Sequence, residues 1–285
     1  MGQLKWHNRP GSKVTGSTHT VMVAAFSGWN DAADAASGAV DHLWDTWHAL
    51  TIASVEPDEY VDFTVTRPGV EVSAGVPGDL RWPVTELGWC TPSPSLSVVL
   101  VRGPEPQFRW RQYCTELVEA ADEIGCSAVV VLGAMLSEVP HTRPVPVFTA
   151  SHDRQVLDMM ALPASDYEGP TGIPSALQEC ARAGGLETVG LWAALPGYAA
   201  GVPSPAGALA LVEQTSTVVG AAVDVSALAD SAAEYAEQLD VLVAEDDDTA
   251  AYLGRLEEAY DVEGAALGSA DELVTEVEDF LRDQG

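Results

Sequence analysis

Between residues 20 and 222, short apolar runs alternate with amphipathic helical patterns. The most continuous run, Ala128–Leu132, is apolar at every position, which indicates a strand buried on both faces. Strands of this kind, separated by helices, are typical of a parallel sheet that is covered on two sides. The sequence therefore predicts an α/β fold with a largely parallel sheet and helices on both faces. The expected strands are Thr20–Phe26, Thr51–Val55, Leu96–Val101, Ala128–Leu132, Val145–Ala150 and Thr188–Ala193.

One stretch in the first half departs from this order and makes the expected sheet mixed. Val61–Thr66 and Val70–Ala74 alternate polar and apolar residues around the turn sequence Arg67-Pro68-Gly69, which predicts a β-hairpin. Helical patterns follow most of the other strands. They cover Asp31–His48, Phe108–Ile124, Arg154–Met160, Ser175–Ala183 and Pro205–Ala222.

Composition divides the chain into three parts. Residues 1–17 are polar and predict a flexible leader, and residues 18–223 form the expected α/β domain. Residues 224–285 contain 19 acidic and two basic residues and predict an acidic helical appendage. Apolar residues recur at helical spacing in its first helix, so one face requires a partner, either the α/β domain or a neighbouring subunit. The appendage's helical patterns are Ser226–Leu242, Thr249–Tyr260 and Asp271–Leu281.

The formal net charge of −30 restricts the classes of partner. A surface this negative repels phosphate backbones and anionic lipids, so we expect neither nucleic-acid nor membrane binding. Both lysines, Lys5 and Lys13, lie in the expected leader, so the folded body has no lysine for Schiff-base or phosphate-loop chemistry. The four cysteines show no C-x-x-C spacing and no secretory signal is visible, so the expected compartment is the cytoplasm.

Four stretches, taken in order, resemble one known family. They are FSGWNDAADAAS at residues 26–37, DFTVTRPGV at 62–70, VPHTRP at 139–144 and GPTGIPSAL at 169–177. Together they resemble the proteasome assembly chaperone 2 family, in particular its long bacterial members of the actinobacterial type. The resemblance covers residues 20–222, and the helical tail is also typical of that branch.

This resemblance implies a phosphorylase/hydrolase-like α/β architecture and assembly into homo-oligomers, including trimers. The eukaryotic relatives are non-enzymatic chaperones for proteasome α subunits. They dock through a C-terminal tripeptide of a hydrophobic residue, tyrosine and any third residue. This sequence ends in FLRDQG and lacks that tripeptide. The resemblance therefore predicts the fold better than the biochemical task.

The first glycine turn is a candidate binding site, because it follows a strand and opens an alanine-rich helix, an arrangement that often binds phosphate. Asp31 and Asp34, however, already bring negative charge to the first helical turn, and their repulsion argues against a bound phosphate. One alternative is a helix capped by Asn30 or Ser27, with the aspartates facing the helix dipole. Another is a polar rim that binds a different ligand at the carboxyl end of the first strand.

The VPHTRP stretch is the strongest chemical candidate. Its prolines restrict the backbone around His141 and Arg143. Arginine binds carboxylates or phosphates through paired N–H groups, and a neutral histidine can accept or donate a proton. Arg67, also beside a proline, could form a second arm of the same basic pocket. The alternative is that the arginines neutralise carboxylates, in which case we expect Asp31 or Asp34 to pair with Arg67 or Arg143.

Two further segments complete the candidate site. Thr171 and Gly172 precede the Ser175–Ala183 helix, where they favour either an anion site or a helix cap. Tyr198 belongs to a Gly/Pro-rich loop that either lines a pocket or carries an intersubunit contact.

The leading hypothesis is a homo-oligomeric, chaperone-like protein that acts through contacts with itself and with another protein complex. The alternative is a phosphorylase- or hydrolase-like enzyme that binds a small anion with Arg67, His141 and Arg143. The sequence favours the non-enzymatic hypothesis, and no residue is assigned a catalytic role. We expect no cofactor and no metal.

Overall fold

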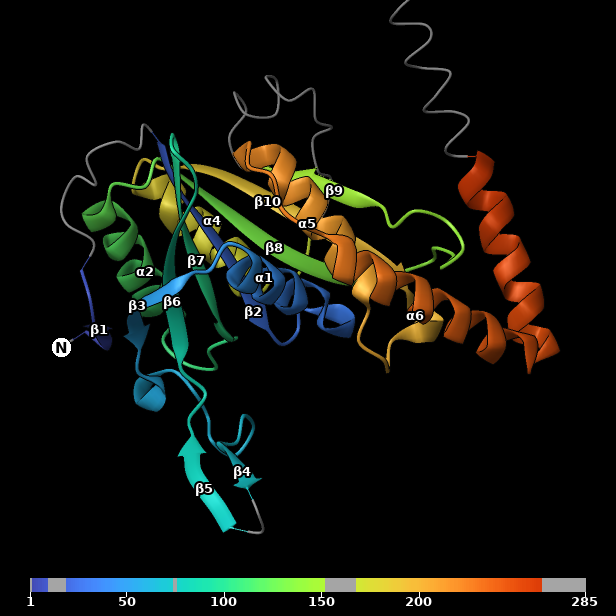
Figure 1. The fold of residues 1–285 in the computed structure, drawn as a ribbon, viewed down its shortest axis with the longest axis horizontal. Helices are drawn as coiled ribbons and strands as arrows, with labels where there is room; N and C mark the ends of the chain where they lie inside the picture. Colours follow the sequence, from blue (N-terminus) through green and yellow to red (C-terminus); the bar gives the residue numbers. More distant parts are fainter. Residues whose placement is uncertain (1, 10–18, 74–75, 152–167, 263–285) are drawn as a thin grey trace, which may run out of the picture.

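A computed structural model describes residues 2–9, 19–73, 76–151 and 168–262. The strands are β1 (Leu4–Trp6), β2 (His19–Ser27), β3 (Leu50–Val55), β4 (Gly69–Ser73), β5 (Val76–Arg81), β6 (Thr85–Ser93), β7 (Leu96–Pro104), β8 (Ala128–Ser137), β9 (Val147–Ala150) and β10 (Glu187–Pro196). Eight of them form one sheet with the order β1-β3-β6-β7-β2-β8-β10-β9 (Figure 1). Strands β7, β2, β8 and β10 are parallel and lie inside antiparallel edges. The mixed α/β sheet predicted from the sequence is confirmed; three of its seven strand pairings, those at its centre, are parallel and the other four are antiparallel.

Helices cover both faces of this sheet. The helices are α1 (Ala35–Thr46), α2 (Trp110–Ile124), α4 (Ile173–Ala183), α5 (Pro205–Val219) and α6 (Ser226–Ala244), and another helix covers residues 247–262. One core lies under α1 and α5, and the other lies under α2 and α4. The α/β class predicted from the sequence is therefore confirmed.

The central strand β2 shows why the sequence folds into two cores. Val23 and Ala25 point into the core under α1 and α5. Met22, Ala24 and Phe26 point into the core under α2 and α4. Because successive side chains of a strand face opposite sides of the sheet, a strand covered on both sides is apolar at every position.

The hairpin predicted around Arg67-Pro68-Gly69 was wrong. Residues 61–66 form turns, because the Asp62 carboxylate accepts hydrogen bonds from the amide and hydroxyl of Thr64, and the Asp62 carbonyl accepts from Val65. The hairpin is instead formed by β4 and β5, which pair with each other and with no other strand of the described chain. It extends away from the body as an arm (Figure 1).

The sequence also failed to predict β1 and β6. Residues 4–6 were expected in a flexible leader, but they form an antiparallel edge strand on β3. The Glu116 carboxylate on α2 fixes this edge strand by accepting hydrogen bonds from the amides of Gln3 and Leu4. Strand β6 contains Gly88 and Pro92, and its pairing with β7 is irregular near its end, so no clean alternation marks it in the sequence.

The predicted helices differ from the observed ones mainly at their first turns. A short 3-10 turn (Ala32–Asp34) precedes α1, and Ala33 and Asp34 in it have positive φ angles of 49° and 51°. The expected helices Arg154–Met160 and Asp271–Leu281 lie outside the described residues. No described helix is long and apolar enough to cross a bilayer. The expected division at residue 223 stays a prediction.

Candidate functional site

The first group of candidate residues lies at the carboxyl ends of the parallel strands. Asn30 follows β2, Glu105 follows β7, and Gly172 precedes α4. One Glu105 carboxylate oxygen accepts a hydrogen bond from the Ile173 amide at 3.1 Å, and the other lies 3.4 Å from the Trp29 amide. The Asn30 carbonyl accepts from the Ala134 amide of β8 at 2.7 Å. These contacts join the ends of three strands to the first turn of α4.

The buried Asp31 carboxylate accepts hydrogen bonds from the first turn of α1. Its Oδ1 accepts hydrogen bonds from the amides of Ala36 and Ser37 at 2.7 and 3.1 Å, and its Oδ2 accepts from the Ser37 hydroxyl at 2.6 Å. Burial raises the pKa of Asp31, and the hydrogen bonds from Ser37 and Ala36 oppose that rise. Asp31 therefore caps this helix, and the expectation that Asn30 or Ser27 would do so was wrong.

Carboxylates of the chain occupy the first turns of both helices that the sequence suggested for anion binding. Asp31 occupies the first turn of α1, and Glu105 occupies that of α4. A helix N-terminus attracts anions through its free N–H groups, so a phosphate would have to displace a carboxylate at either place. Thr171 and Asp34 are exposed nearby, whereas Gly172 is buried against Asn30.

The second group of candidate residues lies in the loop that follows β8, where it contacts α6 and the helix at residues 247–262. The His141 side chain is only 2% exposed and lies between Tyr198 and Asp240 of α6. One neutral tautomer satisfies all its contacts: Nε2–H donates to Asp240 at 3.1 Å, and Nδ1 accepts from the Tyr198 hydroxyl at 2.7 Å. The same hydroxyl accepts a hydrogen bond from the His141 amide. His141 is thus fixed on both sides of its ring.

Arg143 is bound by two carboxylates from the helix at residues 247–262. Its Nε and Nη2 donate to the two carboxylate oxygens of Asp261, each at 2.8 Å. Its Nη1 lies 3.3 Å from Glu257. The bond to Asp261 raises the pKa of Arg143, and the guanidinium in turn lowers the pKa of Asp261. Two parallel N–H bonds to one carboxylate are the strongest geometry that arginine can adopt.

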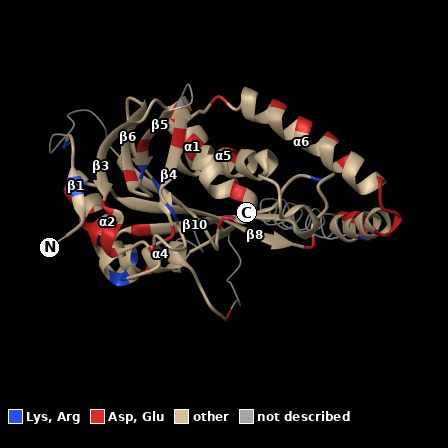
Figure 2. Ribbon diagram, turned by 90° about the horizontal axis from the view of Figure 1, so that it is seen from below, with Lys and Arg blue, Asp and Glu red and all other residues tan. Residues whose placement is uncertain are grey.

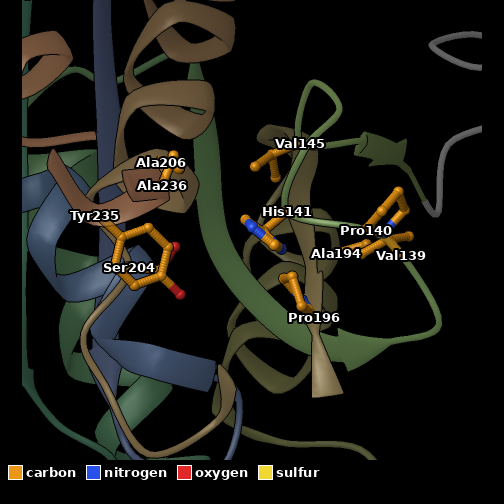
Figure 3. Close-up of a pocket in the computed structure, with 10 residues that line it drawn as sticks. All are labelled: Val139, Pro140, His141, Val145, Ala194, Pro196, Ser204, Ala206, Tyr235 and Ala236. Atoms are coloured by element: carbon orange, nitrogen blue, oxygen red, sulfur yellow. The ribbon is translucent and has the colours of Figure 1, made fainter. Parts of the chain in front are cut away.

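A small cavity lies beside His141, between the body and α6 (Figure 3). Ser204 and Tyr235 lie on its opposite wall. Its volume of about 20 Å³ has room for about one water molecule. The amide of Ser204 donates to the carbonyl of Ala33, which connects this wall to the turn before α1.

The expected basic pocket of Arg67, His141 and Arg143 does not form. Arg67 is exposed at the base of the arm, and the other two residues are engaged by the appendage. The expected pairing of Asp31 or Asp34 with Arg67 or Arg143 was also wrong. Among the described residues, no ion pair within 4.0 Å joins either aspartate to either arginine. The preferred partners of Arg143 lie more than a hundred residues away in the chain.

The arm presents apolar side chains to solvent, and sequence reasoning missed this surface. Val72 and Val76 are 63% and 66% exposed, and Leu80 is 54% exposed. At the base of the arm, the rings of Phe63 and Trp82 pack edge to face at 4.9 Å. The alternation in Val70–Ala74 indicated a strand of a hairpin, but its predicted partner was residues 61–66, whereas this strand pairs with β5. The other exposed apolar residues of this region are Val65, Val70 and Trp82.

Acidic residues are distributed along α6 and the helix at residues 247–262 (Figure 2). The arm together with its base, residues 63–82, contains two arginines and two acidic residues, so this segment carries no net charge. The whole formal charge of −30 therefore lies elsewhere in the chain. The segment 63–82 therefore differs clearly in charge from α6 and the helix at residues 247–262.

This α/β fold, an eight-stranded mixed sheet with helices on both faces, has solved relatives. The model of the PAC2 family matches residues 25–243, and the chain belongs to this family. A PAC2 family protein from Streptomyces avermitilis is 42% identical, with a TM-score of 0.76, and the match covers 82% of this chain and 99% of that one. No curated protein matches the sequence.

Two structures from Mycobacterium tuberculosis are also similar. A proteasome-assembly chaperone homologue is 39% identical, with a TM-score of 0.75, over 82% of this chain and 99% of that one. A protein of unknown function is 25% identical, with a TM-score of 0.84, over 95% of this chain and 92% of that one. The family predicted from the four sequence stretches is thus confirmed.

Proposed function

We propose that this protein is a chaperone-like, non-enzymatic member of the PAC2 family that acts through protein–protein contacts. It self-associates, as a trimer or another homo-oligomer, and it contacts another protein complex. The observation that carries this proposal is the exposed apolar arm formed by β4 and β5. Family membership and a relative described as a proteasome-assembly chaperone homologue support it.

The arm requires a partner on physical grounds. A two-stranded hairpin is marginally stable in water unless a third element covers it. Contiguous apolar side chains on a protein surface mark sites of interaction. Because the arm and its base together carry no net charge while the rest of the chain is strongly acidic, contacts made through them add little to the repulsion between copies. We therefore place the self-association surface on the arm.

The alternative of an anion-binding enzyme has less support. Arg143 is already bound by Asp261 and Glu257, and His141 is almost fully buried. The cavity beside His141 has room for about one water molecule. An enzyme would need these groups to be open to a substrate.

Native mass measurement of the purified chain and of a Val72→Asp/Leu80→Asp variant tests the proposal. We expect the wild-type chain to form an oligomer at micromolar concentration and the variant to dissociate, because charge would replace apolar contact. Val241→Asp on α6, a site 61% exposed, is the matched control and should leave the mass unchanged. A wild-type monomer, or an arm variant with the wild-type mass, would contradict the proposed surface.

A further inference from the structure

The loop formed by residues 140–144 presents three outward polar groups from a fixed backbone. Pro140 and Pro144 restrict the backbone at both ends of the loop. The hydroxyl of Tyr198, which follows β10, contacts both the backbone amide and the ring Nδ1 of His141. The outward groups are the Arg143 guanidinium, the Thr142 hydroxyl and the Pro144 carbonyl. Because Tyr198 follows β10, these two hydrogen bonds to His141 do not depend on α6 or on the helix at residues 247–262.

All three outward groups contact one face of the helix at residues 247–262. Glu257 accepts from Thr142 and Arg143, Asp261 accepts two bonds from Arg143, and the Tyr260 hydroxyl donates to the Pro144 carbonyl at 3.0 Å. Glu257, Tyr260 and Asp261 are spaced i, i+3 and i+4, which places them on adjacent turns of one helical face. The loop therefore recognises a pattern: two carboxylates one turn apart, with a tyrosine between them.

Among its described residues, this helix buries fewer side chains than α6. Helix α6 buries Tyr235, Leu239 and Val243, whereas the buried side chain of the second helix is Leu256. Besides the edge-to-face contact of Tyr252 with Tyr198, its contacts with the loop are polar or charged and partly exposed, and Asp261 is 55% exposed in its pair with Arg143. Such contacts are individually weak and are screened by salt. The short connection to α6 keeps the helix near the loop at a high effective concentration, which compensates for weak contacts.

We propose that the 140–144 loop is a docking site for an acidic helix of a partner protein, and that the chain's own helix at residues 247–262 occupies it as an intramolecular competitor. The partner helix carries two carboxylates at i and i+4 and a tyrosine at i+3, because those are the groups that the loop binds here. This surface is separate from the arm, so the inference stands independently of the function proposed above. A partner helix that binds the loop tightly enough displaces the helix at residues 247–262, and one that binds weakly does not.

Fluorescence anisotropy with a labelled peptide of residues 247–262 tests this site on the full-length chain. The chain variant Glu257→Gln/Asp261→Asn weakens the internal contact, and we expect it to bind the peptide at least tenfold more tightly than the wild type. Adding Arg143→Ala to this variant should abolish binding. The matched control, Glu245→Gln/Glu258→Gln, removes two charges that contact no residue of the loop, and it should behave like the wild type.

Hydrogen exchange of the same variants reports release of the internal helix directly. Amides of residues 247–262 should exchange faster in the Glu257→Gln/Asp261→Asn chain, while those of α6 keep their protection. If the released chain binds no peptide, or if Arg143→Ala leaves the binding unchanged, the docking site is refuted. If light and isotopically heavy wild-type chains instead exchange appendages and form mixed-mass dimers, the assignment to a foreign partner is overturned.

Discussion

Gly172 lies so close to the side chain of Asn30 that a Cβ atom at residue 172 would come within 1.6 Å of the Asn30 Oδ1. The same Cβ would lie 3.0 Å from Oε1 of Glu105. The backbone of Gly172 has φ −106°, which any residue can adopt, so the glycine is required by space and not by conformation. This contact fixes how closely α4 approaches the end of β2.

Gly172→Ala is therefore expected to lower the free energy of unfolding by about 1–3 kcal/mol, the usual cost of overpacking. Adding Asn30→Ala should recover most of the loss, because it removes the clashing oxygen. That oxygen is buried and has no hydrogen-bond partner, so its removal costs little. Denaturant unfolding of the two single variants and the double variant measures the coupling. Gly69→Ala, with nothing within 4 Å, is the matched control.

Asp31 should stabilise α1 through its three hydrogen bonds. Asp31→Ala leaves the amides of Ala36 and Ser37 without an acceptor and is expected to cost about 2 kcal/mol of unfolding free energy. Asp31→Asn keeps an oxygen acceptor and should cost less. Thermal or denaturant unfolding checks both, and equal stability of Asp31→Ala and the wild type would contradict the capping role.

The pH dependence of this residue has a definite sign. Burial raises the pKa of Asp31 above 3.8, so the folded protein holds a proton there more tightly than the unfolded chain. The part of the stability that comes from proton binding at Asp31, as distinct from its capping hydrogen bonds, is therefore fully present below pH 3.8 and is lost as the pH rises through the folded pKa. As the pH rises from 3.8 through the folded pKa, the unfolding free energy of the wild type should therefore fall relative to that of Asp31→Asn. Denaturant unfolding of both proteins at several pH values measures this difference.

The sequence predicts those helices and strands whose own residues show a clear hydrophobic pattern. The central strands are apolar throughout, as β2 and β8 show, and their pattern alone placed them in a covered sheet. Arg143 and His141 were recognised as unusual because they lie between prolines. Their partners could not be found, because Asp261 and Asp240 lie about a hundred residues away and look like any other acids of the tail. Contacts of that kind depend on packing, which no local pattern records.

The edge strand β1 illustrates the same limit. Glu116 on α2 is buried and accepts hydrogen bonds from the amides of Gln3 and Leu4 and from the Tyr60 hydroxyl. Burial above all, together with the hydrogen bond to the Glu116 carboxylate and its charge, raises the pKa of Tyr60. Residues 2–9 carry no strong strand pattern, and the segment is held by distant parts of the chain: its pairing with β3 and the Glu116 carboxylate on α2.

Glu116→Ala should therefore release β1. It leaves several donors without an acceptor and is expected to cost about 2–4 kcal/mol of unfolding free energy. Hydrogen exchange should show loss of protection at residues 4–6, while β2 stays protected. Glu119→Ala, an exposed position on the same helix, is the matched control and should change neither quantity. Retained protection of β1 in Glu116→Ala would show that its pairing with β3 is sufficient.

The appendage should respond to ionic strength through Arg143. Raising salt from about 0.05 to 0.5 M shortens the Debye length and weakens exposed ion pairs. We expect amides of residues 247–262 to exchange faster at high salt, with little change in α5. In Arg143→Ala the fast exchange should already be present at low salt and should respond little to added salt. Exchange that is independent of salt in the wild type would show that apolar contacts hold this helix.

The thiols should differ sharply in reactivity. Burial raises the pKa values of Cys90, Cys114 and Cys126 to about 12, whereas Cys180 is only partly buried. Because the thiolate is the reactive form, about one part in ten thousand of a thiol with pKa 12 is ionised at pH 8. A thiol reagent should modify Cys180 rapidly in the native protein, and all four cysteines only after denaturation. Cys180→Ser should remove the fast phase, and a remaining fast thiol would show that one of the two cores opens readily.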